Sequence, residues 1–193
     1  MIYVQTLEKY LVVINKLRSL ITTFFHKPRF HSFGKKSKLG RNCLIMGGRK
    51  IKVGKKVTIG NEVWLNAGDL EEKVEGQTLI IGDGVYIGAR THINAFKDVV
   101  IEDNVLIGED VYIGDTDHNY SENRPIKQQG WDFKGSVLIG NGSYICKGAV
   151  VLPGIEVGQN SVVGPYAVVT RNVPERTLAM GNPARCLPIK SSN

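Results

Sequence analysis

A histidine stands where an otherwise regular chain becomes irregular. Residues 112–140 read "YIGDTDHNYSENRPIKQQGWDFKGSVLIG", and the polar, aromatic middle of this stretch differs from the sequence on both sides. A neutral imidazole, with a pKa of about 6.5, accepts a proton near neutral pH, so His118 is a candidate general base. Asp117 or Asp115 could hold the ring in one tautomer, as a carboxylate does in catalytic triads. Asp115 could equally cap the preceding turn.

The other residues able to do chemistry form no second constellation. His26, His31 and His92 are interpreted as surface or packing residues, and only His92 and His118 lie in the repeating part of the chain. A catalytic zinc site would need three converging ligands, so we expect no metal. The three cysteines are an odd number without a C-x-x-C pair, and no cleavable secretory signal precedes them. We therefore expect reduced thiols and a cytoplasmic protein.

From residue 39 onward the chain repeats with a period of six. Aliphatic residues stand six apart at Ile139, Ile145, Val151, Val157, Val163 and Val169. The same spacing links Val53, Ile59 and Leu65, then Ile81, Ile87 and Ile93, and, shifted by two, Ile101, Ile107 and Ile113. A six-residue unit suits a short strand and a tight turn, so three units make one triangular coil and successive coils stack as parallel strands. Glycines that directly follow the inward aliphatic residues fit the corners of such a coil.

Positive charge is concentrated in the N-terminal third. Residues 1–60 hold 14 Lys and Arg against the single acid Glu8, whereas residues 61–193 hold 11 against 17 acids. Such a block is either a solvated face or a surface that attracts an anionic membrane, an acidic polymer or nucleic acid. No aromatic residues able to stack on bases are interleaved with these cations, so we expect no nucleic acid partner.

The first 30 residues predict an amphipathic helix. Its apolar positions are Val4, Leu7, Leu11, Ile14, Leu17 and Ile21, and Pro28 limits its extension. Charged and polar residues interrupt any run of about 18 apolar residues, which argues against a transmembrane span. Two interpretations remain: the helix packs on its own domain or on a neighbouring subunit, or it contacts a membrane surface.

The motifs "IGDGVYIGARTHI", "IGNGSYICKGAVVLPGIEVGQNSVVGPYAVVTRNVPERTLAMGNPAR" and "DHN" resemble those of the hexapeptide-repeat acyltransferases. The order of the parts is most similar to sugar O-acetyltransferases related to maltose and galactoside acetyltransferases and to enzymes that decorate surface polysaccharides. The resemblance implies a mainly β fold, a left-handed parallel β-helix. We expect a helical segment over residues 1–30, the β-helix over 31–175 with an extruded loop at 119–134, and a C-terminal extension over 176–193.

The resemblance also implies roles for residues near the break. His118 matches the catalytic histidine that removes the proton of a sugar hydroxyl, with Asp117 as a possible orienter. Asn94 falls in the preceding coil, where related enzymes use Asn to hold the acceptor sugar, although an Asn in a coil corner or in an Asn ladder would look the same. Trp131 could pack on a sugar face, on the pantetheine arm of the donor, or only within the loop.

The implied donor is acetyl-CoA, and the implied assembly is a homotrimer with active sites between subunits. The matching donor positions are Tyr144, Cys146, Lys147, Gly148, Pro165, Thr170, Arg171, Arg185 and Lys190. Tyr144 replaces the Trp of many relatives, and Lys190 would stand in for a basic residue that is absent where Pro188 lies.

Three classes of function follow. The first is acetyl-CoA-dependent O-acetylation of a sugar, within capsule, lipopolysaccharide or exopolysaccharide biosynthesis. The second keeps the donor but acetylates a nucleotide-linked amino sugar, an antibiotic or serine. The third is a β-helix that transfers no acyl group, either a metal enzyme or a scaffold. The sequence leaves the acceptor and the acetylated hydroxyl open.

Overall fold

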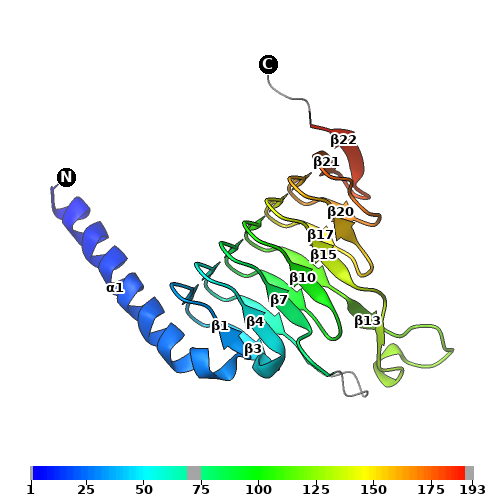
Figure 1. The fold of residues 1–193 in the computed structure, drawn as a ribbon, viewed down its shortest axis with the longest axis horizontal. Coiled ribbons are helices and arrows are strands. Elements are labelled where there is room, and N and C mark those ends of the chain that lie inside the picture. Colours follow the sequence, from blue (N-terminus) through cyan, green and yellow to red (C-terminus); the bar gives the residue numbers. More distant parts are fainter. Residues whose placement is uncertain (1, 69–74, 190–193) are drawn as a thin grey trace.

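The computed structural model describes residues 2–68 and 75–189, without the side chains of residues 2–9, 11, 12, 15 and 16. Figure 1 shows a long helix followed by a stack of triangular coils that ends in a short antiparallel strand. The chain passes through three parallel sheets in turn, here called A, B and C, and each full coil contributes one strand to each sheet. This is the arrangement predicted from the six-residue period.

The strands of the coil are two to four residues long. Sheet A has the order β1 (Ser32–Phe33), β4 (Ile51–Val53), β7 (Leu79–Ile81), β10 (Val99–Ile101), β15 (Val137–Ile139) and β18 (Glu156–Val157). Sheet B has the order β2 (Lys38–Leu39), β5 (Thr58–Ile59), β8 (Tyr86–Ile87), β11 (Leu106–Ile107), β16 (Tyr144–Ile145), β19 (Val162–Val163), β21 (Thr177–Met180) and β22 (Arg185–Pro188). Sheet C contains β3 (Leu44–Met46), β6 (Trp64–Asn66), β9 (His92–Asn94), β12 (Tyr112–Gly114), β17 (Val150–Val151) and β20 (Val168–Val169).

The aliphatic residues of the repeat form the core of the coil. Ile87, Ile107 and Ile145 are consecutive partners in sheet B, and all three are fully buried. The two-residue shift of the repeat falls at residues 95–98, where the chain turns from sheet C to sheet A. Because the strands on both sides keep their register, the extra residues enlarge this corner without disturbing the core.

Glycine is required at the corners because neighbouring coils approach closely. A Cβ on Gly88 would collide with the backbone of Gly108 in the next coil. Asn104 and Asn160 occupy left-handed turn positions, with φ of 57° and 53°. Asn tolerates this conformation better than most residues, which explains its place in these turns.

The N-terminal residues form α1 (Ile2–His26), followed by the short 3-10 helix η1 (Lys27–Arg29). Ser19 Oγ donates to the Leu39 carbonyl at 2.9 Å, and the Leu39 N–H donates to Thr23 Oγ1 at 2.9 Å. Polar side chains of α1 therefore supply hydrogen-bond partners for backbone groups at the open edge of strand β2. Among the residues that the structure describes, no helix is long and apolar enough to cross a membrane.

The apolar positions of α1 do not pack on its own domain where their side chains are described. Ile14, Leu17 and Ile21 are all exposed, which excludes packing of these side chains on the coil of the same chain and leaves a neighbouring subunit or a membrane surface as the alternatives. The side chains of Val4, Leu7 and Leu11 lie outside the described part of the helix. The physical reason is local: the edge of β2 needs hydrogen-bond partners, and Ser19 and Thr23 supply them.

The break in the repeat is a β-hairpin at the corner between sheets C and A. Strand β13 (Thr116–His118) pairs antiparallel with β14 (Trp131–Phe133), and the 3-10 helix η3 (Ile126–Gln128) lies in the connection. Figure 1 shows the hairpin projecting away from the coil beside β13. His118 is thus a strand residue, paired with Trp131, and the excursion begins before residue 119.

Two further features complete the fold. The 3-10 helix η2 (Gly48–Lys50) lies at the same corner in an earlier coil. Residues 176–189 extend sheet B, because β21 pairs parallel with β19 and β22 then turns back along β21. The C-terminal extension is therefore part of the sheet.

Candidate active site

Asp115 anchors the base of the hairpin. Its side chain is fully buried, and its carboxylate accepts the backbone N–H groups of Phe96, Lys97 and Asp98 at 3.0, 2.7 and 2.8 Å. The Thr116 hydroxyl donates to the same carboxylate at 2.7 Å. A buried carboxylate with four donors is fully occupied, so Asp115 holds the hairpin to the preceding corner and does not orient His118.

The His118 ring is oriented by a backbone carbonyl. Nδ1 lies 3.3 Å from the Gly130 oxygen across the hairpin. Because a carbonyl can only accept a hydrogen bond, this contact requires a proton on Nδ1 and leaves Nε2 of the neutral ring able to accept another. Asp117 Oδ1 accepts the backbone N–H of His118 at 2.7 Å, so the contact of Asp117 is with the histidine main chain.

Aromatic stacking continues from His118 into the coil. The imidazole stacks on Trp131 with ring centroids 3.8 Å apart, and Trp131 stacks on Phe96 at 5.6 Å. Phe96 is buried, whereas Trp131 is 48% exposed. Lys97 lies over the Phe133 ring, 4.9 Å from its centroid. The stack fixes the plane of the imidazole and leaves part of the indole open to a ligand.

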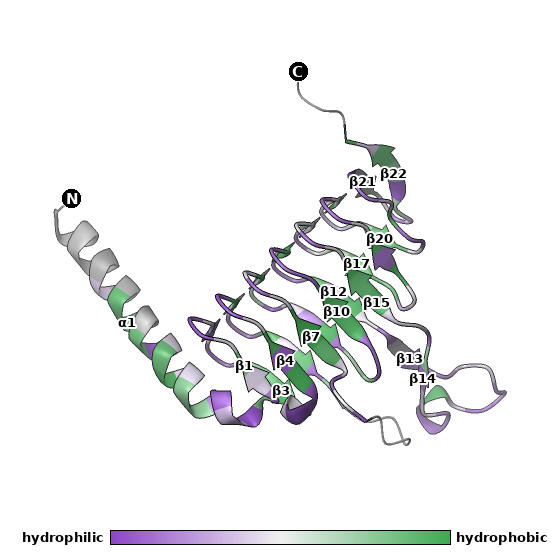
Figure 2. Cartoon of the chain, viewed as in Figure 1, coloured by the Kyte–Doolittle hydropathy of each residue, from purple (hydrophilic) through white to green (hydrophobic). Residues whose placement is uncertain are grey.

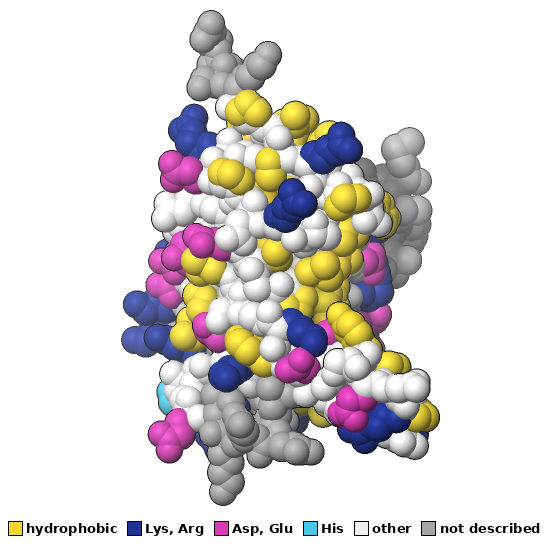
Figure 3. Space-filling view, turned by 90° about the vertical axis from the view of Figure 1, so that its right-hand side faces the viewer, with side chains coloured by type: hydrophobic (Ala, Val, Ile, Leu, Met, Phe, Trp, Pro, Cys, Tyr) yellow, Lys and Arg dark blue, Asp and Glu magenta, His cyan; other side chains and the backbone are white. Residues whose placement is uncertain are grey.

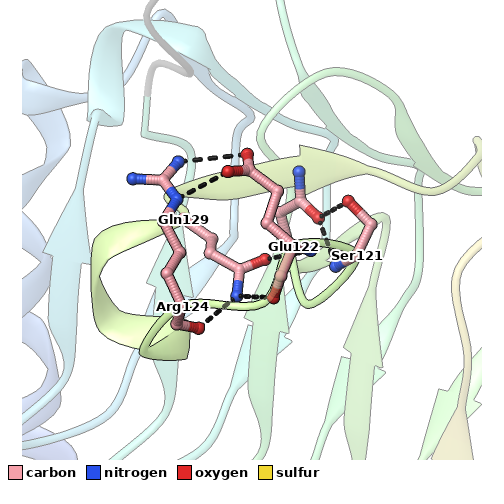
Figure 4. Close-up of polar contacts among 5 residues, drawn as sticks. Ser121, Glu122, Arg124 and Gln129 are labelled. Atoms are coloured by element: carbon pink, nitrogen blue, oxygen red, sulfur yellow. Dashed lines mark hydrogen bonds and ion pairs between the residues drawn. The ribbon is translucent and has the colours of Figure 1, made fainter.

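The tip of the hairpin is closed by a buried glutamine (Figure 4). Gln129 Nε2 donates to the carbonyls of Glu122 and Arg124 at 2.9 and 2.6 Å, and its Oε1 accepts the Glu122 N–H at 2.9 Å. Arg124 binds the Glu122 carboxylate through two nitrogens and lowers the pKa of that carboxyl. Gln129 directly precedes Gly130, so the clamp fixes the carbonyl that orients His118. Sequence reasoning missed this role, since a single Gln in a polar loop carries no signal.

Asn94 belongs to a buried polar ladder on sheet C. It is 8% exposed, accepts from Asn66 Nδ2 at 3.3 Å and donates to the Tyr112 hydroxyl at 3.3 Å. Trp64 stacks on His92 at 4.0 Å beside this ladder. Burial lowers the pKa of His92, and a hydrogen bond with Asn94 opposes the shift. The amide of Asn94 is therefore engaged within the coil.

Six of the expected donor residues lie at two different corners of the coil, while Tyr144 is on β16 and Arg185 on β22. Residues 146–149 and 164–167 form the corner between sheets B and C, which holds Cys146, Lys147, Gly148 and Pro165. Gly148 has φ of 68°, and a Cβ there would collide with the Tyr166 ring. Burial raises the pKa of the Cys146 thiol, and a hydrogen bond with Cys146 raises the pKa of Tyr144.

Charged side chains surround the same corner. Asp110 forms a bidentate pair with Arg90, at 2.7 and 2.9 Å, and lies 3.5 Å from the Lys147 ammonium. The hydrogen bond from Arg90 lowers the pKa of Asp110. Lys147 and Arg90 therefore interact with the same carboxylate.

Thr170 and Arg171 follow β20 and lie at the corner between sheets C and A, the corner that carries the His118 hairpin. Arg185 is exposed on β22, opposite Met180. Lys190 lies outside the described residues. Figure 3 shows hydrophobic and charged side chains interspersed over one side of the coil. Within one chain, sheet C thus separates Thr170 and Arg171 from the Cys146 corner.

The described residues contain no group of three or more His, Cys, Asp and Glu side chains arranged to hold a metal ion. His92 stacks between sheet-C aromatics, while His118 lies on the hairpin. The chemistry that this site can perform is proton transfer by the imidazole next to a partly open aromatic surface.

Two family models match the chain. The bacterial transferase hexapeptide model matches residues 136–171, and the hexapeptide repeat of succinyl-transferase matches residues 98–114. A probable acetyltransferase of Mycobacterium tuberculosis is 35% identical over 124 residues, which are 63% of this chain and 41% of the relative. The galactoside O-acetyltransferase of Lactococcus lactis is 28% identical over 108 residues, covering 56% and 51%. The chain thus spans about half the length of these curated relatives.

One solved structure shares nearly the whole fold. It is a mutant N-acyltransferase from Bacillus cereus in complex with dTDP-4-amino-4,6-dideoxyglucose and coenzyme A. The TM-score is 0.74 at 18% identity, over 89% of each chain. This likeness shows the fold, a left-handed parallel β-helix. The chain therefore carries hexapeptide repeats of the kind that bacterial transferases contain, and it shares its fold with an N-acyltransferase of known structure.

Proposed function

We propose that the protein is an acetyl-CoA-dependent O-acetyltransferase that acts on a sugar hydroxyl, with His118 as the general base. The observation that carries the proposal is the contact between His118 Nδ1 and the Gly130 carbonyl, which leaves Nε2 basic. The acetyltransferases among its relatives support the reaction class. The proposed setting is the cytoplasm, in capsule, lipopolysaccharide or exopolysaccharide biosynthesis.

The residues of the hairpin suggest how the reaction proceeds. His118 Nε2 would take the hydroxyl proton as the sugar oxygen attacks the thioester carbonyl, and the imidazolium would return that proton to the departing thiolate. The Gly130 carbonyl would stabilise the imidazolium through Nδ1–H. The exposed part of Trp131 offers an apolar surface for a sugar ring. Asp117 would position His118 through the hydrogen bond that it accepts from the His118 main chain. Asn94 would contribute indirectly, by holding the ladder of side chains on sheet C through its bond to Tyr112.

The pantetheine arm of the donor is proposed to bind along Cys146, Lys147, Gly148, Pro165, Thr170 and Arg171, with Tyr144 near the thioester and with Arg185 and Lys190 near the nucleotide phosphates. Sheet C separates two of these groups within one chain. A homotrimer would resolve the separation, because one corner of a subunit could face a different corner of its neighbour. The proposed active site therefore lies between subunits.

A second acceptor class has a specific observation in its favour. The solved N-acyltransferase with the same fold holds a nucleotide-linked amino sugar together with coenzyme A. We keep acetylation of a nucleotide-linked amino sugar as the alternative function. The same base would serve either reaction, so the acceptor panel must include both hydroxyl and amino sugars.

The test of the base is thiol release from acetyl-CoA with a panel of sugars, nucleotide-linked sugars and amino sugars. His118→Ala should lower turnover by about 10²–10⁴-fold, because a positioned general base contributes that much. His31→Ala, which alters an exposed histidine far from the hairpin, is the matched control. Near-wild-type turnover of His118→Ala, on an acceptor that the wild type acetylates well, would overturn the assignment.

The test of the donor is thermal unfolding with acetyl-CoA. Ligand at about 100 times its dissociation constant should stabilise the fold by about 2.7 kcal/mol. Arg185→Ala should weaken binding, whereas Lys127→Ala, on the hairpin tip, should not. The absence of any shift at millimolar acetyl-CoA would refute the proposed donor.

A further inference from the structure

Helix α1 presents an apolar surface that its own domain leaves uncovered. Figure 2 shows hydrophobic residues along the described part of this helix. The exposed large hydrophobic side chains of α1 are Tyr10, Val13, Ile14, Leu17, Leu20, Ile21, Phe24 and Phe25. Phe24 and Phe25 are 75% and 71% exposed. We call these eight side chains the α1 stripe.

The α1 stripe is one continuous face of the helix. At 100° per residue, its eight positions fall within an arc of about 140°. Ser19 and Thr23, which bind the edge of β2, lie on the opposite side of the helix. The attachment to the coil therefore points the stripe away from the protein.

The chain that follows Tyr10 through the first coils is rich in basic residues. Residues 10–61 contain 13 Lys and Arg and no Asp or Glu. Arg18 is exposed and lies at the border of the stripe, because its position around the helix axis is close to that of Phe25. Lys38, on the strand to which α1 is attached, is exposed as well. Apolar and cationic groups thus occupy the same end of the molecule.

We propose that α1 lies in the surface of an anionic membrane, with the α1 stripe inserted among the lipids and the surrounding cations facing lipid phosphates. An in-plane amphipathic helix binds through buried apolar area together with attraction to anionic headgroups. Both contributions are present, the first in the exposed apolar side chains of α1 and the second in the basic residues that follow them. This proposal is independent of the proposed catalytic function.

Charge favours a membrane over a second copy of α1. Pairing two α1 stripes about a two-fold axis would bring the basic first coils of both copies together. Like charges facing each other across an interface oppose association, whereas an anionic surface attracts the same cations. A contact between α1 and another part of a second subunit is an outcome that the test below detects.

The experiment is sedimentation of the purified full chain with vesicles of phosphatidylcholine containing phosphatidylglycerol, compared with phosphatidylcholine alone. Binding should require the anionic lipid and weaken with added salt. The double variant Phe24→Ser, Phe25→Ser should lower the partition coefficient by about 100-fold, because two inserted aromatic side chains are lost. Arg18→Gln with Lys38→Gln should lower it by about tenfold.

The matched control is Met180→Ser with Leu187→Ser, two exposed apolar residues at the other end of the coil. This pair should bind vesicles like the wild type. Circular dichroism and native mass are measured for every variant, and Leu20→Glu provides a second disruption of the stripe. The proposal is overturned if the wild type does not bind anionic vesicles, or if folded Phe24→Ser, Phe25→Ser binds equally well. It is also overturned if the native mass of that variant shows a smaller oligomer than the wild type forms, while the wild type does not bind vesicles.

Discussion

The coil and the hairpin are stabilised in different ways. In the coil, each inward aliphatic residue meets an equivalent residue of the next coil, as Ile87, Ile107 and Ile145 do, and backbone ladders join the strands. In the hairpin, single side chains hold the structure: Asp115 at the base and Gln129 at the tip. The loss of one side-chain contact should therefore change the backbone conformation of the coil less than that of the hairpin.

The difference corresponds to a division of labour. The coil is a stack of similar layers and supplies a rigid corner, whereas the hairpin departs from the repeat and places an imidazole beside a partly exposed indole. Loops held by a rigid scaffold are common places for chemistry. Asp115 and Phe96 form the contacts that join the two regions. We expect these contacts to hold the hairpin, and with it His118, in a fixed position relative to the coil.

The largest effect should come from breaking the junction. Asp115→Ala leaves three backbone N–H groups and a hydroxyl without their acceptor, and we expect a loss of about 4 kcal/mol in unfolding free energy together with a fall in turnover. Chemical denaturation measures the first effect and acetyl transfer the second. Asp103→Ala, which removes an acceptor of one exposed N–H, should cost about 1 kcal/mol or less. Equal losses in both variants would show that the junction is not special.

A cavity in the coil should lower stability without altering the site. Ile107→Ala removes a fully buried side chain and should cost about 3 kcal/mol in unfolding free energy. Turnover per folded molecule should stay at the wild-type value. Leu106→Ala, at the neighbouring exposed position, is the control and should change stability little. A marked loss of turnover in folded Ile107→Ala would contradict the separation of the two regions.

The tip of the hairpin should show the reverse behaviour. Gln129→Ala removes the clamp on the Glu122 and Arg124 carbonyls and frees the segment that carries Gly130. We expect about a tenfold loss of turnover, since the imidazole loses its fixed orientation, with the melting temperature of the coil nearly unchanged. Gln128→Ala, on the exposed neighbour, should keep wild-type turnover. If both glutamine variants behave alike, Gln129 does not position His118.

The smallest effect should be a pH dependence that belongs to the coil. Burial lowers the pKa of His92 below its usual 6.5, so the unfolded chain takes up this proton at a higher pH than the folded one. The stability conferred by the neutral ring is present above pH 6.5 and is lost as the pH falls through the lowered pKa. His92→Phe should reduce this acid sensitivity in thermal melts between pH 7.5 and 5.5, whereas His31→Phe should retain it. An unchanged pH profile in His92→Phe would assign the sensitivity to other groups.

The sequence predicted the coil well because the information is local and repeated. A period of six defines which residues point inward, and any coil that obeys it brings Ile81, Ile101 and Ile139 into register. The departure of the chain near His118 was visible as an interruption of that period. The hairpin pairing was not visible, since His118 meets Trp131 only after the chain reverses direction.

Other features of the site depended on side chains that are distant in sequence. Asp115 had two possible roles from its position, and the three N–H groups of residues 96–98 decided between them. The donor positions form one group by resemblance, yet the three-sided coil places Cys146, Lys147, Gly148 and Pro165 at one corner and Thr170 and Arg171 at another.

The sequence by itself determined the repeat, the fold class, the basic N-terminal third and the histidine at the break. Only the tertiary structure decided which partner orients the imidazole and which side of α1 faces the coil. The physical reason is the range of the interactions involved. A buried aliphatic register is specified every six residues and tolerates many equivalent side chains. A hydrogen bond such as that from His118 to Gly130 joins two particular atoms, and its existence depends on the path of the chain between them.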